Sequence, residues 1–119
     1  MVNPLGYAAA EAAWRQGDPW RQRLVGLLRR QMHLVAAAVE QIPGLQWIPP
    51  QATYLAWIDC RGTGVADPFA ACLAAGLGPS DGLDFGAPGF IRLNVACPTD
   101  RLEMGLSRLQ MAFSSPSRG

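Results

Sequence analysis

Arg92 is the residue of this sequence whose type and position best suit binding chemistry. It lies in the segment 90–96 (FIRLNVA), in which the alternate residues Ile91, Leu93 and Val95 are apolar. Successive side chains of a β-strand point to opposite faces, so Arg92 and Asn94 are predicted to lie on the face away from the core. A guanidinium on a rigid strand, beside the glycine-rich loop 82–89, can bind a carboxylate through two hydrogen bonds. The alternative is a structural arginine that faces solvent or pairs with a carboxylate of the chain itself.

The cysteine and histidine residues indicate neither a metal site nor a disulfide framework. Cys60, Cys72 and Cys97 are far apart and form no Cys-x-x-Cys pair, which favours reduced thiols in the cytoplasm. His33 is the single histidine, so a Ser–His–Asp arrangement could form only through it. The loop 80–86 (SDGLDFG) lacks the spacing of a calcium or phosphate loop and is typical of a turn.

The charged and aromatic residues narrow the classes of partner. All ten basic residues are arginine, so no lysine is present to form a Schiff base or act as a general base. A net charge of +1 favours neither a nucleic acid nor an acidic membrane as partner. The uncharged stretch 41–58 is interrupted by prolines and is not predicted to cross a membrane. Trp47, Tyr54 and Trp57 could stack on a ligand, although packing in a core or an interface is the simpler interpretation.

Helices that could position Arg92 are predicted from periodicity and capping signals. Residues 4–16 are alanine-rich and favour a helix, which Gly17 ends. Asp18 and Pro19 are predicted to cap and open a long amphipathic helix over 18–42, since its apolar residues recur every three to four positions. Two further helices are expected, from a cap at Asp67 to about Leu77 and after a cap at Thr99 or Asp100.

The strands and the composition predict the fold class. Residues 45–48 favour an edge strand, 53–59 (TYLAWID) and 90–96 favour strands, and 78–89 favours a loop. The 119 residues are about half hydrophobic, enough for one domain with a core. We therefore expect an α/β fold of the two-layer α+β kind. Its small, mainly antiparallel sheet would have helices packed on one face.

Three segments of the sequence together resemble one enzyme family. They are residues 3–20 (NPLGYAAAEAAWRQGDPW), 43–60 (PGLQWIPPQATYLAWIDC) and 82–98 (GLDFGAPGFIRLNVACP). They are similar to the C-terminal part of fold-type I pyridoxal-phosphate enzymes of the class I/II aminotransferase superfamily. Within it, the nearest branch is the cystathionine β-lyase-like C–S lyases. The resemblance covers residues 3–113 and is most specific at 89–98 (GFIRLNVACP).

The resemblance implies a role for Arg92. The family's arginine at this strand position binds the α-carboxylate of an amino-acid substrate. The lysine that carries pyridoxal phosphate lies upstream of this region in the family, so no catalytic, cofactor-binding or metal-binding residue is assigned here. The loop before the strand departs from the family, because it lacks part of a G-x-G-E-G-type stretch, so no substrate-side role is assigned to the loop.

The resemblance also implies a domain organisation. Residues 1–119 would form the C-terminal small domain of a larger, cytoplasmic, homodimeric enzyme, with 1–17 as a remnant of the interdomain helical segment. The chain would then be part of a C–S β-lyase or an aminotransferase, inactive by itself because the cofactor-binding domain is missing. We expect the helix 4–16 to expose apolar surface, including Trp14, that this domain would cover.

Two other interpretations remain open at this point. The chain could be one half of a two-chain enzyme whose other polypeptide carries the lysine. Alternatively, it could be a small non-catalytic binding or interaction domain that reuses the fold, with Arg92 holding an amino-acid carboxylate.

Overall fold

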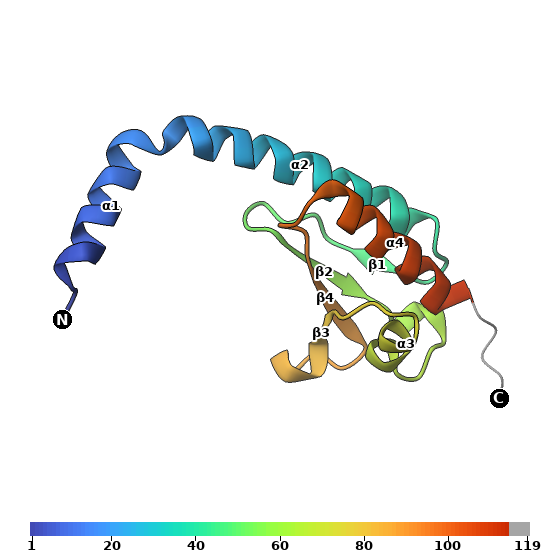
Figure 1. The fold of residues 1–119 in the computed structure, drawn as a ribbon. Coiled ribbons are helices and arrows are strands. Elements are labelled where there is room, and N and C mark those ends of the chain that lie inside the picture. The colour runs from blue at the N-terminus through green and yellow to red at the C-terminus, as the bar shows by residue number, and fades with distance from the viewer. Residues whose placement is uncertain (115–119) are drawn as a thin grey trace.

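The computed structural model describes residues 1–114, which form α-helices and one small β-sheet (Figure 1). The elements follow in the order α1 (Pro4–Gln16), α2 (Asp18–Glu40), β1 (Gln46–Trp47), β2 (Leu55–Asp59), the 3₁₀ turn η1 (Arg61–Thr63), α3 (Pro68–Ala74), β3 (Ser80–Asp81), the 3₁₀ turn η2 (Gly82–Phe85), β4 (Phe90–Asn94) and α4 (Thr99–Ser114). Among these residues, no helix has both the length and the apolar character needed to cross a membrane.

The sheet is antiparallel throughout, with the strand order β1-β2-β4-β3. Helices α2 and α4 lie side by side along one of its faces, and α3 packs against α4 and β4 (Figure 1). The predicted fold class, a small antiparallel sheet with helices on one face, is confirmed. The register places Arg92 of β4 opposite Trp57 of β2 and opposite Ser80 of β3, at the centre of the sheet.

One hydrophobic core lies between the sheet and the helices. The alternation predicted for β4 is confirmed, because Ile91 and Leu93 are buried whereas Arg92 is half-buried and Asn94 is exposed. The core side chains contributed by the other elements are Val35, Val39, Ile42, Leu45, Ala56, Ile58, Cys60, Cys72, Val95, Leu102, Leu106 and Leu109. The buried face of the sheet is thereby filled, so Arg92 is left on its outer face.

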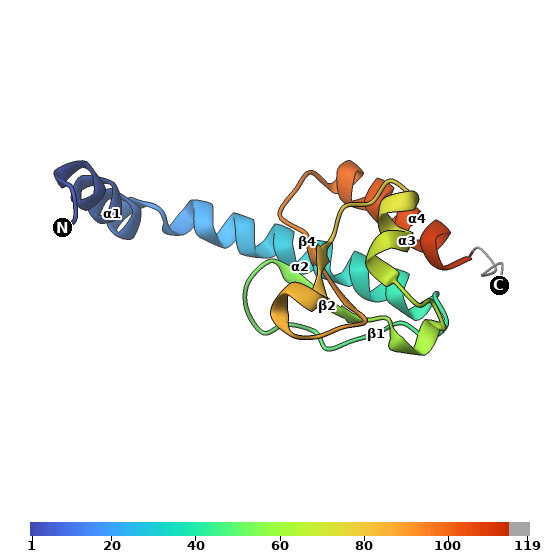
Figure 2. The ribbon, with the colours of Figure 1, turned by 90° about the horizontal axis from the view of Figure 1, so that it is seen from below.

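Helix α1 and the first half of α2 extend away from this core (Figures 1 and 2). None of the side chains of α1 is buried, and the molecule measures 58 × 31 × 23 Å. The helix has the predicted bounds, and the Asn3 side chain accepts hydrogen bonds from the backbone of Leu5 and Gly6. Apolar side chains therefore lie in solvent here, as expected for Trp14.

The predicted N-cap of the second helix is wrong. Gly17 occupies the cap position with helical dihedral angles, and its backbone N–H donates to Ala13. The two helices are therefore almost continuous, and Asp18 already lies inside α2. Its carboxylate accepts hydrogen bonds from the side chains of Arg21 and Gln22 instead, at 2.8 and 2.7 Å.

Several element boundaries also differ from the sequence-based expectations. Helix α2 ends at Glu40 and α3 at Ala74, and β2 begins only at Leu55. Thr53 precedes β2 with a positive φ of 70°, which removes it from the strand. The segment 78–89, expected to be a loop, contains the short strand β3 and the turn η2. Both of these lie next to Arg92, so this correction concerns the candidate site directly.

Candidate functional site

The Arg92 guanidinium lies on the outer face of the sheet and is held there by two contacts. Its Cζ atom is 4.4 Å from the centroid of the Phe85 ring, and its Nη2 donates to Ser80 Oγ at 3.2 Å. Among residues 1–114, no carboxylate forms an ion pair with it. Since a guanidinium carries several N–H donors, most of its donors are available to a ligand.

Aromatic rings surround Arg92 on this face. Trp57, directly across from Arg92 in the sheet, meets the Phe85 ring edge-on, with centroids 5.9 Å apart and an interplanar angle of 84°. On its other side Trp57 stacks on Phe90 at 5.4 Å and 17°. Trp57 thus packs within an aromatic cluster on the outer face, whereas Trp47 packs against the core and Tyr54 is exposed. Such ring pairs restrict one another's movement and give Arg92 a rigid surrounding.

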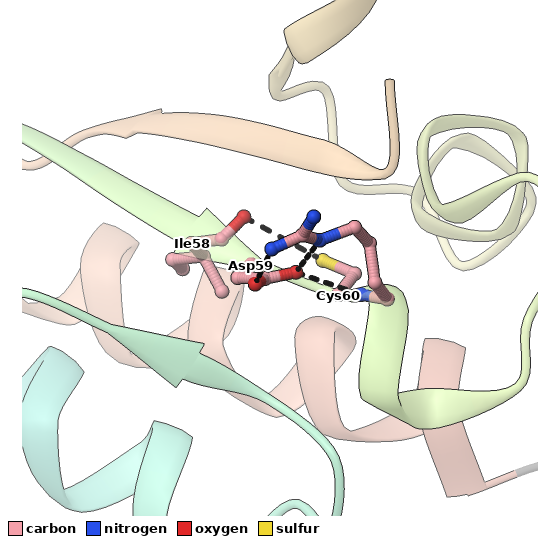
Figure 3. A network of polar contacts seen from close by, with 4 residues as sticks. Ile58, Asp59 and Cys60 are labelled. Atoms are coloured by element: carbon pink, nitrogen blue, oxygen red, sulfur yellow. Dashed lines mark hydrogen bonds and ion pairs between the residues drawn. The ribbon is translucent and has the colours of Figure 1, made fainter. Parts of the chain in front are cut away.

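A second arginine on the same face already binds a carboxylate. Arg61 lies over the Phe90 ring at 4.8 Å, and its Nε and Nη2 donate to the two oxygens of Asp59 at 2.9 and 2.7 Å. Its backbone N–H also donates to Asp59, and Figure 3 shows these contacts beside Ile58 and Cys60. These hydrogen bonds hold the pKa of the Asp59 carboxyl below its usual value.

The thiols and the histidine do not join this site. Cys60 and Cys72 are buried, and burial raises the pKa of these thiols to about 12 and about 11, so both stay protonated. His33 is exposed on α2 and lines a groove between this helix and the segment 49–54. In the part of the chain that the structure describes, no group of three His, Cys, Asp or Glu side chains could hold a metal ion.

A groove between α2 and the segment 49–54 lies away from Arg92. It has a volume of about 590 Å³, and Leu28, Met32, Trp47 and Tyr54 contribute to its mostly apolar lining. Arg92 is not among its lining residues, so this groove is separate from the candidate site.

Two features around Arg92, and one on the opposite side of the sheet, were not identified from the sequence. Phe85 and Ser80 were assigned to a loop, and the pairing of Arg61 with Asp59 was not considered. Gln31, only 1% exposed on α2, donates through Nε2 to the carbonyl oxygen of Cys97 at 2.7 Å and so ties α2 to the chain just after β4. A polar residue within the apolar stripe of the helix was the available signal for Gln31. The two-residue strand that carries Ser80 gave no such signal.

Comparisons with known proteins identify relatives of this chain. Cystathionine β-lyase PatB of Bacillus subtilis is 31% identical over 95% of the chain. The crystal structure of OvoB has a TM-score of 0.91 with 43% identity over 98% of the chain. The pyridoxal-phosphate-bound C–S lyase of Staphylococcus hominis has a TM-score of 0.85 with 27% identity over 97% of the chain.

The chain spans less than a third of the length of these proteins: 31% of PatB, 31% of OvoB and 32% of the S. hominis lyase. An LL-diaminopimelate aminotransferase is also among the relatives. No protein-family model matches the sequence. The predicted resemblance to the C-terminal part of such enzymes is confirmed.

Proposed function

We propose that this chain uses Arg92 to bind the α-carboxylate of the substrate in a cystathionine β-lyase-like pyridoxal-phosphate enzyme. The sequence and the fold of the chain match the C-terminal part of such enzymes. The enzyme would be a C–S β-lyase acting on amino-acid thioethers or, as the second candidate, an aminotransferase. Both reactions begin with an amino acid, so both require a cation for its carboxylate.

The observation that carries the proposal is the state of Arg92. It is half-buried at the centre of the sheet, lies on an aromatic ring and has no carboxylate partner among residues 1–114. A structural arginine in such a position would ordinarily pair with an internal carboxylate, as Arg61 does with Asp59. The free donors of Arg92 suit the two oxygens of a ligand carboxylate.

The residues of this chain do not by themselves form a site for pyridoxal phosphate. The sequence contains no lysine, so it offers no ε-amine for the covalent attachment that the family uses. When bound, the cofactor supplies the electron sink for reactions at the substrate's α-carbon. In this proposal it is held by residues outside these 119, and this chain contributes only the recognition of the carboxylate.

Helix α1 supports the proposal that further protein covers this chain. Its 13 residues include no buried side chain, although isolated helices of about this length are marginal in water. Trp14 is 88% exposed, and Leu5 and Tyr7 are also exposed. We assign residues 1–17 to the segment that joins the small domain to the cofactor-binding domain, in a homodimeric enzyme.

The test is a hybrid enzyme in which residues 1–119 replace the matching region of B. subtilis PatB. Thiol release from a cysteine thioether is measured as a function of substrate concentration. Arg92→Gln should lower kcat/KM by about 30-fold or more, because truncating one partner of a desolvated charge pair costs about 2–5 kcal/mol. Arg61→Gln is the matched control and should leave kcat/KM unchanged. Equal kinetics for the parent and Arg92→Gln would contradict the proposal.

A further inference from the structure

The Arg92 guanidinium lies over the ring of Phe85, with Cζ above the ring. A guanidinium is planar and its N–H groups lie in that plane, so a ring on its face uses none of them. The contact is a cation–π interaction, with 4.4 Å between Cζ and the ring centroid. Ser80 Oγ accepts one N–H of Nη2 at 3.2 Å and thereby fixes the rotation of the plane.

The same face contains a second example of this arrangement with its carboxylate in place. Arg61 lies on the Phe90 ring at 4.8 Å and binds both oxygens of Asp59 through Nε and Nη2. Each arginine lies over its own phenyl ring, Arg61 over Phe90 and Arg92 over Phe85. Within residues 1–114, Arg61 has a carboxylate partner and Arg92 has none. The Arg61 site thus demonstrates that an arginine stacked on a ring can bind a carboxylate bidentately in this fold.

The turn that carries Phe85 is closed by its own backbone. Asp81 Oδ1 accepts from the backbone N–H of Leu83 at 3.0 Å, and the N–H of Ala87 donates to the Gly82 carbonyl at 2.9 Å. Gly86 ends the turn with a φ of +73°, which a residue with a side chain rarely adopts. The backbone from which the Phe85 ring projects is therefore held in place within the chain itself.

Phe85 contributes little to the hydrophobic core. Its side chain is 51% exposed, on the face of the sheet away from the helices, and its ring contacts are with Trp57 and Arg92. A large aromatic residue left half in solvent over a charged side chain is explained by its effect on that side chain.

We propose that Phe85, together with Ser80, is a positioning residue that holds the Arg92 guanidinium in the plane required for bidentate binding of the substrate carboxylate. This inference rests on the proposed function of Arg92. Phe85 is expected to touch neither the substrate nor the cofactor, and to act through the arginine alone.

Nuclear magnetic resonance of the 119-residue chain tests the positioning directly. The Arg92 Nε–Hε signal should carry an upfield ring-current shift and a heteronuclear NOE typical of an ordered group. Phe85→Leu should remove the shift and lower the NOE, whereas Phe85→Tyr should restore both. Leu83→Ala is the matched control, since Leu83 is 63% exposed on the same turn. An Arg92 signal unchanged in Phe85→Leu would overturn the proposal.

In the hybrid enzyme, Phe85→Leu should raise KM about three-fold with kcat unchanged, and Phe85→Tyr should restore KM. If Arg92→Gln raises KM but Phe85→Leu leaves KM at the parental value, the proposal is also overturned. If Arg92→Gln leaves kcat/KM unchanged while Phe85→Leu still lowers the NOE of the Arg92 Nε–Hε group, the proposed function fails and the structural positioning stands.

Discussion

At the scale of single residues, Arg61 and Arg92 differ in what neutralises their charge. Both lie on phenyl rings on the outer face of the sheet. Arg61 has an internal partner in Asp59, two positions before it in the sequence, so its role is explained within the chain. Arg92 has no such partner among residues 1–114, and we propose that a substrate carboxylate neutralises its charge.

The pairing of Asp59 with Arg61 predicts a dependence of stability on pH. Hydrogen bonds from Arg61 lower the pKa of Asp59 in the folded state below the usual value of about 3.9 for an aspartate. The pairing therefore stabilises the protein fully above that value, and the stabilisation is lost as the pH falls through the lower, folded-state pKa. Asp59→Asn should remove this loss of stability at low pH, as measured by the free energy of denaturant unfolding between pH 2 and 7. Parallel pH profiles for the two proteins would refute the assignment.

The buried thiols predict an order of chemical reactivity. Burial raises the pKa of Cys60 to about 12 and of Cys72 to about 11, so neither forms a thiolate near neutral pH. Cys97 is only half-buried. Iodoacetamide at pH 8 should therefore alkylate Cys97 in the native chain, and the other two only after unfolding. Peptide mass spectrometry measures this order, and rapid native labelling of Cys72 would be inconsistent with the structure.

At the scale of elements, the turn after α2 packs closely against the 3₁₀ turn η1. Gly44 has a φ of +88°, and a Cβ atom there would lie 2.3 Å from the carbonyl oxygen of Gly62. The α2–β1 turn and the 3₁₀ turn η1 can thus approach so closely only because both positions are glycine. This contact joins the edge strand to the chain that follows β2.

Gly44→Ala should destabilise the chain by about 1–3 kcal/mol through backbone strain alone. The clash of the added Cβ atom with the backbone of Gly62 should increase this loss. Gly78→Ala is the matched control, since a Cβ atom there has no neighbour within 4 Å and its φ is not positive. That change should be neutral or stabilise by up to about 1 kcal/mol. Denaturant titration measures both, and equal stabilities would contradict the turn geometry.

The elements also show which features local sequence signals can predict. The cap at Asp67 was predicted, and its Oδ1 accepts from the backbone N–H of Ala70 at 2.9 Å. β4 was predicted because its alternation reflects burial on one face. β3 was missed because Ser80 and Asp81 show no apolar alternation, and they pair only because β4 presents a free edge.

The site was predictable only in part for the same reason. Arg92 was identified by its place in the strand alternation. Phe85 lies in contact with it because of how the turn η2 folds over the sheet, which no local pattern specifies.

At the scale of the whole molecule, the chain combines a packed core with an uncovered arm. Helix α1 and the start of α2 extend from the core (Figure 2). Trp14 and Trp20, which belong to this arm, are exposed. A groove of about 290 Å³ lies between these two tryptophans, where α1 meets α2. Large exposed apolar patches mark surfaces that associate with other protein.

The arm therefore predicts concentration-dependent association of the 119-residue chain. Sedimentation velocity should show species larger than a monomer at high concentration, and Trp14→Gln combined with Leu5→Gln should reduce them. Met104→Gln, which changes a 55% exposed apolar residue on α4, is the control and should leave association unchanged. A chain that stays monomeric at every concentration would contradict the inference that the apolar surface of this arm associates with other protein.

The measurement that tests the central claim most directly compares a substrate carboxylate with its amide. In the hybrid enzyme, kcat/KM is determined for S-alkylcysteine and for its α-carboxamide, with the parent, Arg92→Gln and Arg61→Gln. If Arg92 binds the carboxylate, the parent and Arg61→Gln should prefer the acid by about 30-fold or more, and Arg92→Gln should lose that preference. An Arg92→Gln enzyme that still prefers the acid as strongly as the parent would contradict the account.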